Sequence, residues 1–140
     1  MRPTEVVSRS EARTETGAGV KRALVVEDEA GVRGLMALLL ELDGYEVTEE
    51  SSLRRAVQSL NPNRRYDLIL TDYHLSEGPP CSLSERARRL IPGVRVVLTS
   101  GLQASELSCT CRPRCYERFL PKPFSIDGFR ASIREEATGD

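Results

Sequence analysis

From Lys21 onward, short apolar runs alternate with stretches of helical periodicity, and this alternation constrains the fold more than any other feature. The apolar runs predict strands at residues 23–26, 45–49, 68–71, 94–100 and 119–120. Strands that alternate with helices favour a parallel sheet with both faces covered. We therefore predict a doubly wound α/β fold with five strands and about five helices.

The predicted helices lie between these strands. In the first helix, apolar residues recur at intervals of three and four residues, which indicates one buried face. Capping and stop residues mark the later helices. Residues 102–115 have little pattern. The positions that carry these predictions are Val32, Leu35, Met36 and Leu39, with Asp43-Gly44 as the stop; Ser51 or Ser52 as a cap and Pro62 as a stop; Leu83, Ala87 and Leu90 before Pro92-Gly93; and the cap Ser125 before Ile126, Phe129 and Ile133.

Length and composition favour one globular domain of ordinary type. The chain has 140 residues and a formal net charge of −1, which gives no general attraction to nucleic acid or anionic membrane. We predict a polar, flexible tail or linker at 1–20, the domain at 21–137 and a short end at 138–140. No apolar run approaches the ~20 residues that span a bilayer, and residues 1–20 lack the apolar centre of a signal peptide. A cytoplasmic location is the expectation.

Chemically active side chains follow four of the predicted strands. Glu27 and Asp28 end the first strand, Asp72 ends the third, Thr99 ends the fourth, and Lys122 follows the fifth. In a parallel sheet these ends meet at one edge, where such folds bind ligands. Each group alone is more often a turn, cap or strand residue. Their joint occurrence predicts a site.

The chemistry of that site follows from its charges. Carboxylates held close together repel one another, and a divalent cation relieves the repulsion. A few oxygen ligands with room for water suit Mg²⁺. A metal on one side and the Thr99 hydroxyl and Lys122 ammonium on the other would surround a phosphoryl group. One carboxylate would then be able to act as the nucleophile.

Four segments, in this order, surround the predicted site: Leu24-Val25-Val26-Glu27-Asp28-Glu29, Asp67-Leu68-Ile69-Leu70-Thr71-Asp72, Val96-Val97-Leu98-Thr99-Ser100-Gly101 and Phe119-Leu120-Pro121-Lys122-Pro123-Phe124. Together they resemble the receiver domain of two-component response regulators, over about residues 21–137. The resemblance implies a flavodoxin-like fold with a five-stranded parallel sheet of order 2-1-3-4-5. It implies that Asp72 is the phosphoacceptor and that Mg²⁺ is bound by Glu27, Asp28, Asp72 and the backbone carbonyl of His74.

The same resemblance implies a signalling switch. Thr99 matches the switch hydroxyl, Lys122 the lysine that contacts the phosphoryl group, and Phe119 the switch aromatic. The Lys122-Pro123 peptide is typically cis in the family. The phosphoryl donor would be a histidine kinase or a histidine phosphotransfer domain. A downstream protein would bind the surface of the fourth helix, fifth strand and fifth helix. Such a receiver assists its own phosphorylation and dephosphorylation but is not a separate enzyme, and a homodimer is compatible with it.

Two segments depart from the family pattern. The loop after Asp72 continues as residues 76–80, Ser-Glu-Gly-Pro-Pro, and the predicted fourth helix would contain Cys109, Cys111, Pro113 and Cys115. The three cysteines leave a thiol or metal sensor open, although their spacing is not that of a usual zinc site, and incidental loop thiols remain the commoner interpretation.

Other functions stay open at this point. A phosphorylation-independent pseudo-receiver keeps the fold, but the intact set of key residues counts against it. A phosphatase of the haloacid dehalogenase type would have a second Asp where His74 stands. Because no output domain follows, we expect a stand-alone receiver or the C-terminal receiver of a hybrid histidine kinase.

Overall fold

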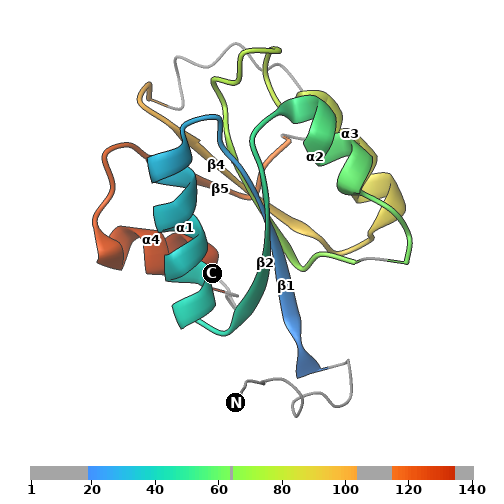
Figure 1. Ribbon diagram of the computed structural model, residues 1–140, viewed down its shortest axis with the longest axis horizontal. Helices are drawn as coiled ribbons and strands as arrows, with labels where there is room; N and C mark the ends of the chain where they lie inside the picture. Colours follow the sequence, from blue (N-terminus) through green and yellow to red (C-terminus); the bar gives the residue numbers. More distant parts are fainter. Residues whose placement is uncertain (1–18, 64, 104–114, 135–140) are drawn as a thin grey trace.

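The computed structural model describes residues 19–63, 65–103 and 115–134, and its centre is a five-stranded parallel sheet (Figure 1). The strand order is β2-β1-β3-β4-β5. This confirms the predicted fold and order. The strands are β1 (Lys21–Val26), β2 (Tyr45–Glu50), β3 (Leu68–Asp72), β4 (Arg95–Ser100) and β5 (Arg118–Pro121).

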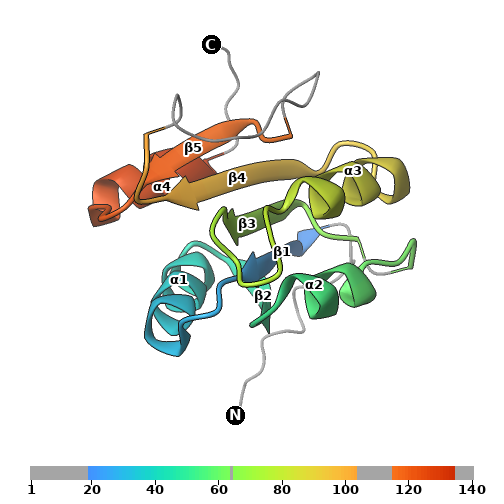
Figure 2. The same cartoon turned by 90° about the horizontal axis from the view of Figure 1, so that it is seen from above.

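Helices cover both faces of the sheet. Seen from above, α1 and α4 lie on one side, and α2 and α3 lie on the other (Figure 2). The described residues contain four helices, against about five predicted; residues 104–114, where the family would place another, lie outside the described residues, as do 1–18 and 135–140. The helices are α1 (Ala30–Leu42), α2 (Leu53–Ser59), α3 (Cys81–Leu90) and α4 (Ile126–Ile133).

The middle residues of the central strands β1, β3 and β4 are apolar, and both of their faces are buried. In β1, Leu24 and Val26 pack toward α2 and α3, whereas Ala23 and Val25 pack toward α1 and α4. All four side chains are fully buried. Burying a valine or leucine side chain contributes about 1.5–3 kcal/mol, so the two apolar layers fix the sheet between the helix pairs.

The buried face of α1 is the predicted one at Val32, Met36 and Leu39 but not at Leu35. Leu35 is 47% exposed, and the buried residues include Met36, Leu39 and Leu40. The segment is apolar nearly all round, so its periodicity alone does not select the face that packs on the sheet. Ile126 in α4 is likewise 59% exposed, while Phe129 and Ile133 are buried as predicted.

Local signals at the helix ends are largely confirmed. Between the two caps considered for α2, Ser52 is the N-cap, and its hydroxyl accepts a bond from the Arg55 N–H at 3.1 Å. Ser125 caps α4 in the same way through the Gly128 N–H. Gly44 has a φ of +95°, a backbone conformation that glycine adopts readily, and it turns the chain from α1 into β2. Among the described residues, no helix is long and apolar enough to cross a membrane.

Candidate functional site

Three carboxylates meet where β1 and β3 end side by side. The two strands are paired in parallel up to Val26 and Thr71, so the next residues, Glu27 and Asp72, leave the sheet at the same edge. Glu27, Asp28 and Asp72 each present an oxygen, and these oxygens all lie within 4.8 Å of one another. Glu27 and Asp72 are buried and Asp28 is exposed, so the cluster opens to solvent on one side.

Lys122 reaches this cluster from the loop after β5. Its Nζ lies 3.0 Å from Glu27 Oε1 and 3.4 Å from Asp72 Oδ2. The Lys122 N–H donates to the Ser100 carbonyl at 2.8 Å, and the Lys122-Pro123 peptide is cis, as the resemblance implied. One ammonium group thus bridges carboxylates from two different strands.

Hydrogen bonds to both its side chain and its backbone hold Glu27 in position. Its Oε2 accepts a bond from the Glu29 N–H at 3.1 Å. Its backbone carbonyl accepts one from Arg33 Nη1 at 2.9 Å. Arg33 also lies 3.5 Å from Glu49 of β2. The sequence analysis did not single out Arg33, because a charged residue in the first turns of a helix carries no signal of the carbonyl it will bind.

Burial dominates the protonation of Glu27. Desolvation raises the pKa of this carboxyl above its ordinary 4.5, and the Asp72 charge acts in the same direction against the opposing bonds from Lys122 and Glu29. Burial disfavours the Lys122 ammonium, but the Glu27 and Asp72 carboxylates outweigh it, so the pKa of Lys122 is raised above 10.5. The site therefore holds a charged lysine beside a carboxyl that is unusually easy to protonate.

Thr99 lies directly across from Asp72 in the sheet register between β3 and β4. Its side chain is fully buried, and among the described residues its hydroxyl has no hydrogen-bond partner. A buried hydroxyl without a partner is costly. Its position beside Asp72 makes it available to an incoming oxygen ligand.

His74 forms the next part of the site edge. Its backbone N–H donates to Asp72 Oδ1 at 3.2 Å, and its Nε2 lies 3.1 Å from Ser100 Oγ. A pocket of about 310 Å³ opens here, bordered by Asp28, His74 and the loop through Pro79. This loop therefore leaves an open pocket beside Asp28.

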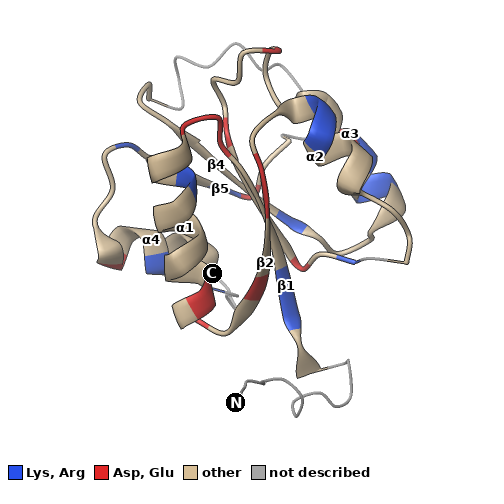
Figure 3. Cartoon of the chain, viewed as in Figure 1, with Lys and Arg blue, Asp and Glu red and all other residues tan. Residues whose placement is uncertain are grey.

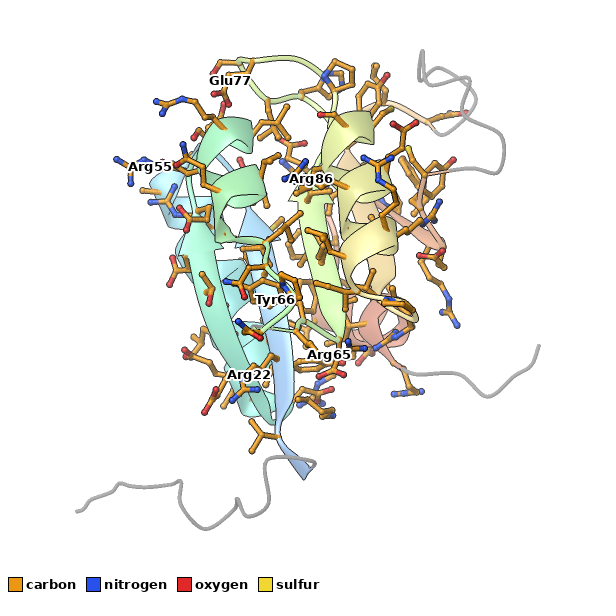
Figure 4. All side chains as sticks on the ribbon, turned by 90° about the vertical axis from the view of Figure 1, so that its right-hand side faces the viewer. Arg22, Arg55, Arg65, Tyr66, Glu77 and Arg86 are labelled. Atoms are coloured by element: carbon orange, nitrogen blue, oxygen red, sulfur yellow. The ribbon has the colours of Figure 1, made fainter. Side chains whose placement is uncertain are left out.

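The loop after Asp72 is tied to α2 by a side chain that the sequence analysis did not identify. Glu77 accepts bonds from the Leu53 N–H at 2.6 Å and the Arg54 N–H at 3.4 Å. Figure 4 shows Glu77 above the first turn of α2. The residues that depart from the family pattern thus supply an acidic partner for a helix N-terminus, which favours negative charge.

Two other predicted residues lie on the α2–α3 side of the sheet. Phe119 is partly buried there, with its ring centroid 6.3 Å from that of Tyr116. Cys115 is buried, and its Sγ lies 3.6 Å from the Sγ of Cys81. Cys109 and Cys111 lie outside the described residues. Nothing in the sequence places Cys81 near Cys115, because 34 residues separate them.

Charged residues are unevenly distributed over the molecule. In Figure 3 several basic residues colour the ribbon of α2 and α3, and acidic residues colour the segment where β1 leads into α1. The basic residues include Arg54 and Arg55 in α2 and Arg86, Arg88 and Arg89 in α3. The acidic edge is thus a local concentration of negative charge in a nearly neutral chain, as a cation site requires.

Comparison with known protein families gives one match. Residues 23–134 match the family model described as response regulator receiver domain. The response regulator receiver protein CpdR of Brucella abortus is 28% identical over 107 residues, covering 76% of this chain and 88% of CpdR. The phosphate regulon transcriptional regulatory protein PhoB of Escherichia coli is 30% identical over 116 residues, covering 81% of this chain. The chain spans about half the length of PhoB.

Solved structures have the same fold. A response regulator receiver protein from Sinorhizobium medicae superposes with a TM-score of 0.72 at 24% identity, covering 83% of this chain and 93% of that one. The response regulator TrrA of Thermotoga maritima, in complex with Mg²⁺-BeF, gives a TM-score of 0.69 at 22% identity, covering 81% of this chain and 96% of that one. At such identities these two similarities concern the fold alone.

Proposed function

Because this chain belongs to the family of response regulator receiver domains, we propose that Asp72 is its phosphoacceptor and that Glu27, Asp28 and Asp72 hold Mg²⁺. Members of this family are phospho-acceptor signalling domains of two-component systems, and the matches favour that function over a phosphorylation-independent module or a thiol or metal sensor. The observation that carries the proposal is the convergence of three carboxylates within 4.8 Å beside the Lys122 ammonium.

The donor set fits magnesium. Oxygen ligands of high negative charge, one of them exposed, leave room for the water that Mg²⁺ retains. The backbone carbonyl of His74 is the proposed fourth protein ligand, since its residue borders the pocket next to Asp28. When bound, the ion neutralises charge on the carboxylates and on the phosphoryl oxygens. The solved complex of TrrA with Mg²⁺-BeF supports this choice of ion.

In the proposed reaction, a carboxylate oxygen of Asp72 attacks the phosphorus of a phosphohistidine. The O–P bond forms, the P–N bond breaks, and the donor imidazole leaves with the electron pair of that bond. Lys122 already lies 3.4 Å from Asp72 and would pair with a phosphoryl oxygen. The buried hydroxyl of Thr99 would donate a hydrogen bond to another. Phe119 would turn inward as Thr99 moves, which couples the site to the surface.

The proposed partners follow from this cycle. A histidine kinase or phosphotransfer domain in the cytoplasm would donate the phosphoryl group. A downstream protein would bind the face made of β5, α4 and the segment that precedes β5. In the element names of the family this is the α4-β5-α5 face, and the family would place its fourth helix within residues 104–114, which lie outside the described residues. A second copy of the chain would be the alternative partner on this face. Water attack on the acyl phosphate would reset the switch, and the receiver itself would assist both this hydrolysis and its own phosphorylation.

The test uses the full chain incubated with acetyl phosphate and Mg²⁺, followed by intact-mass spectrometry. We expect a gain of one phosphoryl group, about 80 Da, that EDTA prevents. Asp72→Asn should abolish the gain. Asp67→Asn is the matched control, because Asp67 immediately precedes the same strand at its opposite end, where its carboxylate accepts a bond from the Arg22 N–H at 2.9 Å. Circular dichroism checks folding. A folded wild-type chain that gains no mass, or an Asp72→Asn variant that still does, would overturn the proposal.

A further inference from the structure

Two thiols from distant parts of the chain are in contact at the start of α3. Cys81 is the first residue of α3, and Cys115 precedes β5. Their sulfur atoms are 3.6 Å apart, and neither cysteine is in a disulfide. An S–S bond is about 2.05 Å long, so the two sulfur atoms would have to move about 1.5 Å closer to form one.

The two thiols differ in their access to solvent. Cys115 is 1% exposed and belongs to the buried cluster on the α2–α3 side of the sheet. Cys81 is partly exposed and packs against the same cluster. A small oxidant therefore reaches Cys81 first, and Cys115 is in place to react with the product. A reactive and a resolving thiol in contact are the arrangement that redox-sensing pairs require.

The segment that carries Cys115 is held against α3 and β4 by Glu117. Glu117 Oε2 lies 2.6 Å from Arg88 Nη2 of α3, and its Oε1 accepts a bond from the Val96 N–H at 2.6 Å. The Glu117 N–H donates to the Val96 carbonyl at 2.8 Å. Because these bonds fix residues 115–118 relative to α3, the contact between the sulfurs is preorganised.

We propose that Cys81 and Cys115 form a reversible intramolecular disulfide when the protein meets a hydroperoxide. The Cys81 thiolate attacks the peroxide, the O–O bond breaks, and a sulfenic acid and an alcohol or water result. The Cys115 sulfur then attacks the sulfenic sulfur, the S–O bond breaks, and the hydroxyl leaves as water with the thiol proton. Two thiols are oxidised and one peroxide is reduced. A dithiol reductant reverses the change.

The bond would join α3 to the chain just before Tyr116 and Phe119. The rings of these two residues are neighbours in the cluster that Cys115 enters. A covalent tie there restrains the start of β5 relative to α3. The modification therefore acts on the same side of the sheet as the proposed switch aromatic, yet it needs no phosphorylation and is tested without it.

The experiment titrates the reduced full chain with hydrogen peroxide. We expect the mass to fall by about 2 Da, with non-reducing peptide mapping linking Cys81 to Cys115, and dithiothreitol restoring the starting mass. The bond closes a loop that includes residues 82–114, so we expect the melting temperature to rise by roughly 5–15 °C. Cys81→Ser and Cys115→Ala should each abolish both changes.

The double variant Cys109→Ser with Cys111→Ser is the matched control and should keep the Cys81–Cys115 bond. Three results would overturn the proposal: a disulfide from Cys81 or Cys115 to Cys109 or Cys111, a bond between two chains, or stable sulfinic acid without a disulfide. A tightly bound thiophilic metal in the native mass spectrum, with both thiols protected from peroxide until it is chelated, would also overturn it. Cys81 is partly exposed, so Cys81→Ser tests the pair even if Cys115→Ala fails to fold.

Discussion

The acidic edge, formed by Glu27, Asp28 and Asp72, and the contact between α3 and the segment just before β5, called the α3–β5 contact below, are built in opposite ways. At the acidic edge, Glu27 and Asp72 are neighbours because β1 and β3 are paired and both end there. At the α3–β5 contact, Cys115 and Glu117 of that segment meet Cys81 and Arg88 of α3, which are far away in the sequence. Strand register alone places the first group, whereas the docking of a helix on the sheet places the second.

The two regions also differ in their electrostatics. The acidic edge brings together like charges that Lys122 only partly neutralises. Burial, and then the Asp72 charge, raise the pKa of Glu27 above its ordinary value. The α3–β5 contact joins opposite charges, since Glu117 meets Arg88 and a backbone N–H. In our proposal the first region binds a ligand, whereas the ion pair and the backbone bond of the second region stabilise the fold, and the following predictions separate these roles.

Removing the ammonium from the acidic edge should have the largest effect. In Lys122→Ala, phosphorylation by acetyl phosphate should fall on the order of 10²-fold, because a donor aimed at the phosphoryl oxygens is lost. The rate is measured by intact mass over time. Lys21→Ala is the control, since its ammonium lies over the Tyr45 ring, 4.6 Å from the centroid. An unchanged rate in Lys122→Ala would mean that the geometry of the edge does not serve the transfer.

Cutting the α3–β5 contact should cost stability but not chemistry. Glu117→Ala leaves the Val96 N–H without its 2.6 Å side-chain bond, which should lower the free energy of unfolding by about 1–3 kcal/mol. Arg88→Ala removes the partly exposed ion pair with Glu117 but leaves the Val96 N–H bonded, and it should cost less than about 1 kcal/mol. Urea denaturation measures both. Equal losses would mean that the bond to the Val96 N–H contributes nothing beyond the ion pair.

Magnesium should stabilise the acidic edge in a pH-dependent way. At ten times its dissociation constant, Mg²⁺ should add about 1.4 kcal/mol to the free energy of unfolding at neutral pH. Because burial and the Asp72 charge raise the pKa of Glu27 above 4.5, this carboxyl takes up a proton early as pH falls, and the magnesium effect should shrink. Melting curves with and without Mg²⁺ between pH 8 and pH 5 measure it.

Without metal, protonation of Glu27 should have the opposite effect on the free energy of unfolding. A carboxyl with a raised pKa in the folded state costs stability above that pKa, and the cost disappears below the unfolded value. Without metal, the free energy of unfolding of the wild type should therefore rise relative to that of Glu27→Gln as pH falls. The pKa of Lys122 is raised above 10.5, so its favourable contribution persists throughout this range. A magnesium effect of constant size from pH 8 to pH 5 would contradict this account of Glu27.

The smallest expected effect concerns the loop that borders the site. Glu77→Gln weakens the acceptor at the start of α2 and should lower the free energy of unfolding by about 0.5–1 kcal/mol. Glu85→Gln, an exposed change within α3, is the control and should stay within about 0.5 kcal/mol of wild type. Thermal unfolding at matched pH compares them. If Glu85→Gln lowered the free energy of unfolding as much as Glu77→Gln, the bonds from Glu77 to α2 would not explain the loss.

The sequence predicted the acidic edge because its geometry depends on periodicity alone. Apolar runs marked the strands, and in a parallel sheet every strand ends at one edge, so Asp28, Asp72 and Lys122 could be placed together before any contact was known. The predicted face of α1 failed at Leu35, since a helix that is apolar nearly all round offers several faces to a sheet. The assignments of Asp72, Thr99 and Phe119 to the phosphoryl switch stay predictions.

The amino-acid sequence by itself determined the strands, the alternation with helices and the carboxylates at the strand ends, because these follow from local pattern and chain order. Only the tertiary structure decided that Cys81 touches Cys115, that Glu77 accepts bonds from the first turn of α2 and that Glu117 joins α3 to β4. Such pairs depend on how far a helix shifts and rotates on the sheet. Side chains from the whole core set that position together, and no short segment encodes it.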